Sequence, residues 1–407
     1  MNKIGFNEVD NSILIAGLGI SGLITACLLA KHDFSVKCFE PTSENHKKQS
    51  VDRRTTAFLN PAVEVLKEIG VWAQLEKFAQ PLSTMEIIDV SNGQRSQTVK
   101  TLFNAKEISI DQFGFNIPNK EVVNVLSKYL KTKKNVECNF EDKIVSHYGY
   151  DDFISVKTDS GSNYNGKLLI ACDGRNSSIR EREKIKSFST SYNQLGLVFE
   201  VAHKFNHNNT TTEILDDGGP FTIIPLKRNA NCNHSTIVWM DYTKNIKEVC
   251  NLDKSTFNKI LQEKSNNARG AIKLNGEKQV YPIITQFAKK LYGKRVVLIA
   301  ESAHVMPPTG AQGLNTSIED IITLSKILVK TRSEGKDIGG NSLLTKYSKS
   351  RLNSIGLKTA GMHFLNKISM TKYPISQKFR KIALNTISQN FTIKSFLMKI
   401  GLKNESL

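Results

Sequence analysis

Runs of consecutive aliphatic residues alternate along this chain with segments whose apolar residues recur at helical spacing. ILIAG (13–17), SVKCFEP (35–41) and RVVLIAE (295–301) have the continuous apolar pattern of strands buried on both faces. ISGLITACLLAKH (20–32) follows the first of them and is expected to form a helix. A strand, a helix and a second strand in this order predict a parallel sheet covered by helices.

Helical spacing also recurs further along the chain. TTAFLNPAVEVLKEIGVWAQL (55–75), NKEVVNVLSKYLKT (119–132) and SIEDIITLSKILVKT (317–331) have this pattern, and the last sixty or so residues are helical and basic. In residues 84–103, short apolar runs flank Asn92-Gly93, which is a hairpin signal.

Strand-like runs dominate the middle of the chain. LGLVFEVAH (195–203), TTTEIL (210–215), FTIIPL (221–226) and STIVWM (235–240) predict an antiparallel sheet in a separate domain. The fold class is therefore α/β with an inserted β-rich domain. The expected division has three parts. The discontinuous first domain comprises residues 1–80, 112–182 and 286–350, and the β-rich domain comprises residues 81–111 and 183–285. The basic helical C-terminal region comprises residues 351–407.

The chain is strongly basic, with a formal net charge of +18 over 407 residues and a pI near 9.5. Such a charge favours anionic partners, namely nucleic acid, acidic lipid or a phosphorylated cofactor. A lysine-rich solvated surface explains it equally well. The sequence has no zinc-finger spacing, aromatic RNP motif or helix-turn-helix, so a nucleic-acid partner is not expected.

Cysteines and the N-terminus indicate a reducing, cytoplasmic location. None of the six cysteines forms a C-x-x-C pair, so neither a disulfide framework nor a cysteine metal site is expected. MNKIGFNEVDNS is polar and acidic, unlike a secretory signal. The eighteen residues 13–30 are apolar enough to suggest a membrane span, but their spaced glycines favour a buried strand, turn and helix.

The first motif is Gly17-Leu18-Gly19-Ile20-Ser21-Gly22, with Glu40 at the end of the second strand. G-x-G-x-x-G is weak evidence alone, but here it follows a strand and opens a helix. Gly17 would make a tight turn, Gly19 would let the backbone approach a diphosphate, and Gly22 would permit close helix packing. Glu40 would accept hydrogen bonds from a ribose. The pattern therefore predicts a dinucleotide site.

The second motif is Asp173-Gly174, which ends the apolar run LLIA (168–171) and precedes RNSSIR (175–180). Asp-Gly after a strand is also typical of a simple turn. Ser177, Ser178 and Arg180, which follow it, make a functional role the better interpretation.

The third motif is AESAHVMPPTGAQGLN (300–315). A buried strand delivers Glu301 to its carboxyl end, where ligands bind in open α/β sheets. Pro307 restricts the backbone, and Gly310 and Gly313 allow it to approach a flat ligand. The helix that begins near Leu314 would favour negative charge at its N-terminus.

His304 also lies in this stretch. A single histidine is more often a packed, hydrogen-bonded residue than a catalyst, and no catalytic residue is assigned.

Together, GLGISG with Glu40, CDGRNSSIR and AESAHVMPPTGAQGLNTSIED resemble the three motifs of the class A flavoprotein monooxygenases. Within that class the chain resembles the UbiH-type hydroxylases of ubiquinone biosynthesis. DRRTTAFLNPAVEVLKEIGVW, GPFTIIPL and PPTGAQGLN are similar to that subfamily's running pattern, so the likeness covers nearly the whole chain. It implies a Rossmann-like FAD-binding domain similar to that of para-hydroxybenzoate hydroxylase.

The resemblance implies a specific set of cofactor contacts. Gly17, Gly19, Gly22 and Glu40 would bind the ADP half of FAD, and Arg54, which precedes TTA, would hold the pyrophosphate or flavin side.

Asp173 and Gly174 would form the motif linked in the family to FAD and NAD(P)H. Glu301 would face the ribityl chain. Pro307 would complete the cofactor site, and the isoalloxazine ring would be lined by Gly310, Gly313, Leu314 and Asn315.

The family's chemistry follows from the same resemblance. NAD(P)H reduces FAD, O₂ forms a flavin C4a-hydroperoxide, and an oxygen atom is transferred to an electron-rich ring. A polyprenylated phenol or quinone precursor is the implied substrate. One departure stands out, since Ala300-Glu301 replaces the common Gly-Asp and adds a methyl and a methylene.

The basic, apolar C-terminal region suits an anionic membrane surface, which would place the protein on the inner face of the membrane. A helical cap packed on the flavin domain fits it as well. Two alternatives to a hydroxylase stay open. One is another flavoprotein of this fold, such as an epoxidase or prenyl-chain reductase; a halogenase is disfavoured because W-x-W-x-I-P is absent. The other is a non-catalytic scaffold among quinone-biosynthesis proteins.

Overall fold

A six-stranded sheet carries the first motif. The computed structural model describes residues 11–44, 52–91, 98–228 and 232–402. The strand order is β18-β19-β12-β1-β2-β8, and every neighbouring pair is parallel except β18 with β19. Their bounds are Tyr292–Gly293, Val296–Leu298, Leu168–Ala171, Ile13–Ala16, Val36–Glu40 and Val136–Phe140. The continuous aliphatic strands β1 and β12 are fully buried, which confirms the predicted parallel sheet.

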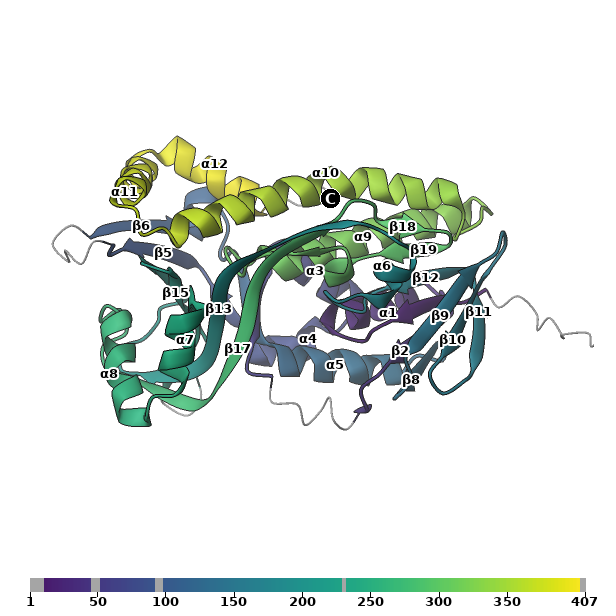
Figure 1. The fold of residues 1–407 in the computed structure, drawn as a ribbon, viewed down its shortest axis with the longest axis horizontal. Coiled ribbons are helices and arrows are strands. Elements are labelled where there is room, and N and C mark those ends of the chain that lie inside the picture. Colours follow the sequence, from purple (N-terminus) through teal and green to yellow (C-terminus); the bar gives the residue numbers. More distant parts are fainter. Residues whose placement is uncertain (1–10, 45–51, 92–97, 229–231, 403–407) are drawn as a thin grey trace, which may run out of the picture.

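Helices complete this unit. α1 (Ile20–Lys31) packs against α5 (Asn119–Lys131), α9 (Gln312–Ser333) and α3 (Asn60–Ile69), and their apolar faces share one core with the sheet. A three-stranded antiparallel sheet of β9 (Ile144–Gly149), β10 (Ile154–Thr158) and β11 (Asn163–Gly166) lies beside it (Figure 1).

The expectation of helical spacing from residue 55 onward was wrong for its first five residues. Thr55–Leu59 forms β3, which pairs with β7 (Gly114–Pro118) in a sheet completed by β4 (Gln80–Leu82). The backbones of β3 and β7 approach closely, since a Cβ on Gly114 would lie 2.0 Å from the Phe58 oxygen. Pro61 near the start of α3 then begins the helix, and α4 (Trp72–Leu75) follows.

The larger sheet has eight strands in the order β20-β17-β13-β16-β15-β14-β5-β6. Their bounds are His304–Val305, Ile272–Ala288, Ser187–His203, Asn233–Tyr242, Gly219–Pro225, Thr210–Asp216, Thr84–Asp89 and Val99–Asn104. The four runs predicted to form an antiparallel sheet, β13 to β16, pair antiparallel as expected, and β14 also runs parallel to β5 from an earlier segment. These two strands come from distant segments, so no short hairpin fixes their relative direction.

Two helices that the sequence patterns did not indicate cover one face of this sheet. α7 (Thr243–Cys250) and α8 (Lys254–Lys264) contribute Ile246, Phe257 and Leu261 to its second core. The strands β5 and β6 pair as a hairpin would, but the turn at Asn92-Gly93 lies outside the described residues, as does most of the charged loop before β3. The domain boundaries stay a prediction.

The C-terminal region is helical, as expected. α10 (Asn341–Ser369) runs along the length of the molecule, and α11 (Pro374–Gln389) and α12 (Phe391–Leu402) fold back beside β6 (Figure 1). Within the described ranges, no helix combines the length and apolar character that crossing a bilayer requires.

Candidate functional site

A cavity of about 320 Å³ opens where β1, β2 and β12 end. β12 and β2 lie on opposite sides of β1 in the sheet. Ligands usually bind at this position in such sheets. Five of the predicted cofactor residues line it together with residues that no motif indicated. The lining residues are Ala16, Gly17, Gly19, Phe39, Glu40, Pro41, Lys143, Ile144, Cys172, Asp173, Gly174, Asn176, Ser178 and Ile179.

The three glycines of the first motif meet different surroundings. Gly17 has a φ of +92°, and a Cβ there would lie 2.5 Å from the Cys172 carbonyl oxygen. A Cβ on Gly22 would lie 2.0 Å from the Gly17 oxygen. A Cβ on Gly19 would meet no protein atom within 4 Å, so it would occupy the cavity itself. Gly17 and Gly22 therefore build the turn, and Gly19 keeps the cavity open.

The N-terminus of α1 borders the cavity at Gly19, and no side chain caps it. The first N–H groups of a helix lack intrahelical partners and carry partial positive charge. A diphosphate at this place would accept hydrogen bonds from them.

Glu40 lies at the end of β2 with 6% of its surface exposed. Its Oε2 accepts a hydrogen bond from the Leu18 amide at 2.7 Å, and its Oε1 accepts one from the Thr42 amide at 3.2 Å. The carboxylate therefore holds the glycine turn in place while it also lines the cavity.

Asp173 supplies the clearest sign of a missing partner. Its Oδ2 accepts a hydrogen bond from the Ile179 amide at 3.2 Å, whereas its Oδ1 is buried without a protein partner. A buried carboxylate oxygen that no donor satisfies is unfavourable unless a ligand hydroxyl or water reaches it. Gly174 has a φ of +82° and lets the chain turn away from the cavity. The uncapped helix, the space beside Gly19 and this orphaned oxygen all fit the ADP half of FAD.

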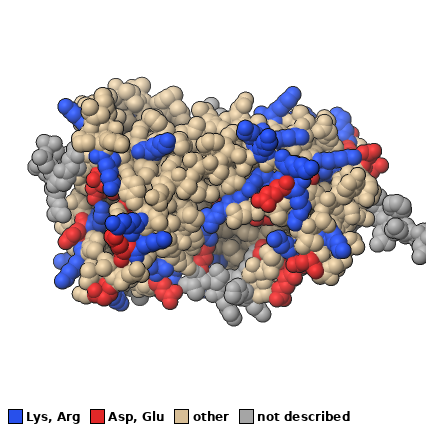
Figure 2. All heavy atoms as spheres, viewed as in Figure 1, with Lys and Arg blue, Asp and Glu red and all other residues tan. Residues whose placement is uncertain are grey.

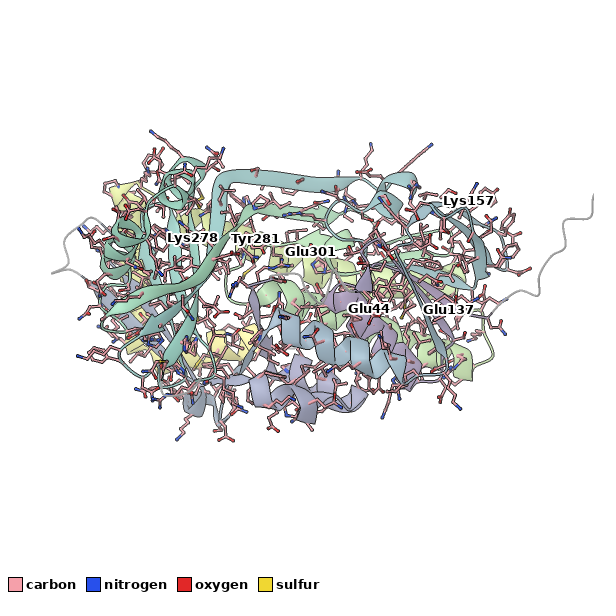
Figure 3. The ribbon with its side chains drawn as sticks, turned by 90° about the horizontal axis from the view of Figure 1, so that it is seen from below. Glu44, Glu137, Lys157, Lys278, Tyr281 and Glu301 are labelled. Atoms are coloured by element: carbon pink, nitrogen blue, oxygen red, sulfur yellow. The ribbon has the colours of Figure 1, made fainter. Side chains whose placement is uncertain are left out.

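A second group of predicted residues lies outside this cavity. Figure 3 shows Glu301, on the short 3-10 turn Ala300–Ser302, near Tyr281 of β17. The Arg54 guanidinium lies over the Tyr281 ring, 4.7 Å from its centroid. Arg54 also donates two hydrogen bonds of 2.9 Å to the Asp52 carboxylate. Burial opposes the charge on Arg54, but the bonds to Asp52 outweigh it and raise the Arg54 pKa.

Arg54 is thus held by Asp52 and Tyr281, neither of which the motifs had indicated. No pattern marks Tyr281, because it lies more than 200 residues away in β17. The predicted contact of Arg54 with the cofactor stays a prediction.

The loop from Pro307 leads into the N-terminus of α9. Gly310 and Ala311 both adopt left-handed backbone angles, with φ of +60° and +57°, and a Cβ on Gly313 would meet no atom within 4 Å. No side chain caps α9 and its first turn has no acid. A flat anionic ligand can therefore approach this turn. Leu314 is partly buried against the main core.

The Asn315 side chain has another task. Its amide nitrogen donates to the oxygens of Ala57 at 2.8 Å and Ala311 at 2.6 Å, and its oxygen accepts from the Leu59 amide at 3.0 Å. The side chain therefore ties α9 to β3, and a ring contact of this residue remains a prediction.

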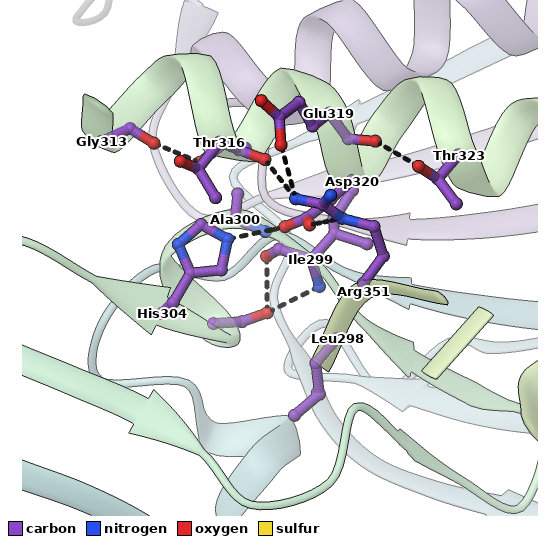
Figure 4. Close-up of polar contacts among 12 residues, drawn as sticks. Leu298, Ile299, Ala300, His304, Gly313, Thr316, Glu319, Asp320, Thr323 and Arg351 are labelled. Carbon is purple, nitrogen blue, oxygen red and sulfur yellow. Dashed lines mark hydrogen bonds and ion pairs between the residues drawn. The ribbon is translucent and has the colours of Figure 1, made fainter. Parts of the chain in front are cut away.

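His304 is packed and hydrogen-bonded, as expected. It is 2% exposed, and its Nε2 lies 2.7 Å from Oδ2 of the buried Asp320 (Figure 4). The same oxygen accepts from the Ala300 amide at 3.1 Å, and Oδ1 accepts from Arg351 Nε at 2.8 Å. Burial works against ionisation of Asp320, but His304 and Arg351 outweigh it and lower the Asp320 pKa. This network positions Ala300 and hence Glu301.

The sequence patterns missed Asp320 and Arg351. They lie within long helices whose apolar spacing gives no sign that two charged residues face inward.

Ala300 itself has a left-handed φ of +56° and is 3% exposed. Such angles favour glycine, so alanine is strained here. The departure from Gly-Asp at Ala300-Glu301 therefore falls on a position whose backbone demands a glycine-like angle.

Comparisons with known proteins agree with this geometry. The FAD binding domain family matches residues 10–356. The chain is 25% identical over 349 residues to the ubiquinone hydroxylase UbiM of Neisseria meningitidis, covering 85% of this chain and 75% of that protein. It is 22% identical to the 3-demethoxyubiquinol 3-hydroxylase of Escherichia coli, covering 96% of this chain and 98% of that protein.

Among solved structures, p-nitrophenol 4-monooxygenase PnpA from Pseudomonas putida superimposes with a TM-score of 0.79 at 17% identity. That alignment covers 98% of this chain and 100% of PnpA. PqsL from Pseudomonas aeruginosa superimposes with a TM-score of 0.76, which supports the same fold. The chain therefore belongs to the FAD binding domain family, and FAD is its cofactor.

Proposed function

We propose that this protein is an FAD-dependent monooxygenase that hydroxylates the aromatic ring of a polyprenylated phenol in ubiquinone biosynthesis, with NAD(P)H and O₂ as co-substrates. The observation that carries the proposal is the likeness to ubiquinone hydroxylases along nearly the whole chain. The cavity and its orphaned Asp173 oxygen support the cofactor.

When bound, FAD supplies the transfer of electrons from NAD(P)H and the activation of O₂. The residues of this chain would bind and orient the cofactor. The α1 N-terminus and Gly19 would hold the diphosphate, Glu40 the adenosine ribose, and Asp173 a hydroxyl group that donates to its Oδ1. Glu301 and the loop from Pro307 to Leu314 would hold the ribityl and ring side.

The substrate would lie on the face of the larger sheet that α7 and α8 leave uncovered. An apolar cluster of Tyr192, Met240 and Ile283 lies on this face, with Met370 at the end of α10 packed against it. These side chains would exclude water from the reacting ring. A polyprenylated substrate resides in lipid, so the protein would work at the inner face of the membrane, beside other quinone-biosynthesis proteins.

The first test is cofactor content. Protein purified in detergent or lipid should absorb as a flavoprotein and release about one FAD per chain on denaturation. Deletion of the gene should then cause a ring-unhydroxylated quinone precursor to accumulate, and the purified enzyme should add one oxygen atom to its ring. An oxygen on the prenyl chain would indicate an epoxidase, and reduction of that chain a reductase.

A scaffold without catalysis is the second candidate, favoured by the strained Ala300 beside Glu301. A colourless protein that fails to bind added FAD would overturn the hydroxylase and support the scaffold.

A further inference from the structure

The C-terminal helical region differs in composition from the rest of the chain. From Asn341 to Leu402, which spans α10 to α12, there are eleven lysine and arginine residues and no aspartate or glutamate. This stretch of the sequence therefore carries most of the net charge of +18. Such a segment attracts anionic partners.

Most of the large apolar side chains that are exposed in the described part of the chain lie in this same region. Of the nineteen that are exposed among the described residues, twelve lie between residues 357 and 400. A soluble protein rarely gathers so many on one surface unless the surface has a partner. We call them the C-terminal apolar surface: Leu357, Phe364, Leu365, Tyr373, Ile375, Phe379, Ile382, Phe391, Ile393, Phe396, Leu397 and Ile400.

Two of its helices turn their apolar stripes outward. In α11 the exposed Ile375, Phe379 and Ile382 are spaced i, i+4 and i+7. Residues 393, 396, 397 and 400 of α12 repeat the same spacing. A surface helix normally directs such a stripe into the core.

The inward sides of these helices are held by polar contacts instead. Arg380 forms a buried ion pair with Asp89 of β5, with Nε 2.6 Å from Oδ2. Thr101 Oγ1 of β6 donates to the Leu384 oxygen at 3.0 Å. Lys394 donates to the Leu102 oxygen at 3.0 Å. The outward direction of the apolar stripes is therefore fixed by the fold.

Cations border the apolar surface. Lys367, Lys378 and Lys399 are exposed on the three helices. In Figure 2 the surface over α11, α12 and the C-terminal end of α10, at the upper left, is a broad area of residues that carry no charge, with Lys and Arg at its margin. Apolar side chains surrounded by lysines, with no acid among them, complement a bilayer whose head groups are anionic.

We propose that α10 to α12 form a docking surface for an anionic lipid bilayer. This rests on the proposed function in one respect, because a polyprenylated substrate would be held in the same bilayer. A protein partner would need hydrogen-bonding groups matched to particular positions, whereas eleven of the twelve side chains of the C-terminal apolar surface are Phe, Ile or Leu, which offer none.

The surface also leads to the cofactor loop. The Gln312 side chain at the start of α9 donates to the Gly401 oxygen at the end of α12 at 3.3 Å. A substrate that leaves the bilayer along α12 would therefore arrive beside the loop expected to hold the flavin ring.

Vesicle flotation tests the proposal with the full-length, FAD-loaded protein. Vesicles of phosphatidylcholine with 30% phosphatidylglycerol should bind the protein at low salt, and pure phosphatidylcholine should bind it at least about tenfold more weakly. The variant F379S/F396S should lose about tenfold in partition coefficient. The variant K367E/K378E/K399E should lose at least as much.

Matched controls replace exposed residues of the same types elsewhere. F188S/F205S removes two phenylalanines that are each 50% exposed, and K134E/K254E/K273E reverses three exposed lysines. Both controls should bind as the parent does. FAD content measured on each sample separates this proposal from the proposed function, because vesicle binding can fail while FAD is retained.

Equal loss in the control and C-terminal variants would overturn the proposal. So would equal binding to both vesicle compositions. A parent protein that ignores vesicles but forms dimers sensitive to F379S/F396S would assign the surface to a second copy of the chain instead.

Discussion

At the scale of single residues, neighbouring glycines of one motif do different work. Gly17→Ala should lower the free energy of unfolding by about 3 kcal/mol, because the new methyl would collide with the Cys172 carbonyl and the backbone angle is left-handed. Gly19→Ala should leave the unfolding of the apoprotein unchanged but weaken FAD binding at least about tenfold, since its methyl would enter the cavity.

Urea denaturation and flavin fluorescence titration measure the two effects. If Gly19→Ala bound FAD as tightly as the parent does, the cavity beside α1 would not be the diphosphate site.

Ala300 offers a test of stored strain. Ala300→Gly should stabilise the protein by up to about 1 kcal/mol, because glycine adopts a φ of +56° without steric penalty. Ala303→Gly is the control. Ala303 has an ordinary φ of −95°, so the same change there should destabilise the protein. Thermal or urea unfolding of the two variants measures the difference, and a loss of stability in both would contradict the strain.

At the scale of elements, β14 carries a buried acid that should make stability depend on pH. Burial raises the pKa of Glu213 to about 7, although Arg380 acts in the opposite direction. Between pH 4.5 and 7 the folded protein would retain a proton that the unfolded chain has released, so stability should fall as pH rises through this window. Glu213→Gln should remove that slope and add up to about 3 kcal/mol above pH 7.

Urea denaturation of parent and variant at pH 5 and pH 8 measures this difference. An unchanged difference between the two proteins at both pH values would show that Glu213 does not titrate in the window.

The contact between α9 and α10 depends on a buried ion pair. Asp320→Asn should lower the free energy of unfolding by about 3–5 kcal/mol, because Arg351 would remain buried beside a weaker acceptor. Asp151→Asn is the matched control, since its pair with Lys294 lies on the surface and should be dispensable. Comparable losses in both variants, measured by chemical denaturation, would contradict this assignment.

At the scale of the whole molecule, the cofactor should stabilise the fold by mass action. Saturating FAD, at about 100 times its dissociation constant, should add about 2.7 kcal/mol to the stability of the apoprotein. ADP should raise the melting temperature by itself, because the observed cavity matches that half of FAD, whereas riboflavin at equal concentration should raise it less. Differential scanning fluorimetry distinguishes these outcomes, and a larger effect of riboflavin would move the main site to the α9 loop.

The sequence alone determined features that depend on local geometry. Buried parallel strands, the glycine turn and the acid at the end of β2 follow from composition and spacing within about thirty residues, and they were predicted. Asp173 lies at the same cavity because β12 pairs with β1. The sequence indicated a strand that ends in Asp-Gly, but not that this strand is the neighbour of β1.

The tertiary structure decided what depends on distant partners. Residues 55–59 became a strand because β7 lies beside them, although their apolar spacing also suits a helix. The Asn315 side-chain amide donates a hydrogen bond to β3, and Arg54 contacts Asp52 and Tyr281. Asp320 forms an ion pair with Arg351 inside the core. Local patterns carry no information about which segments will meet. The outward direction of the apolar stripes on α11 and α12 likewise became visible only once their polar sides had packed against β5 and β6.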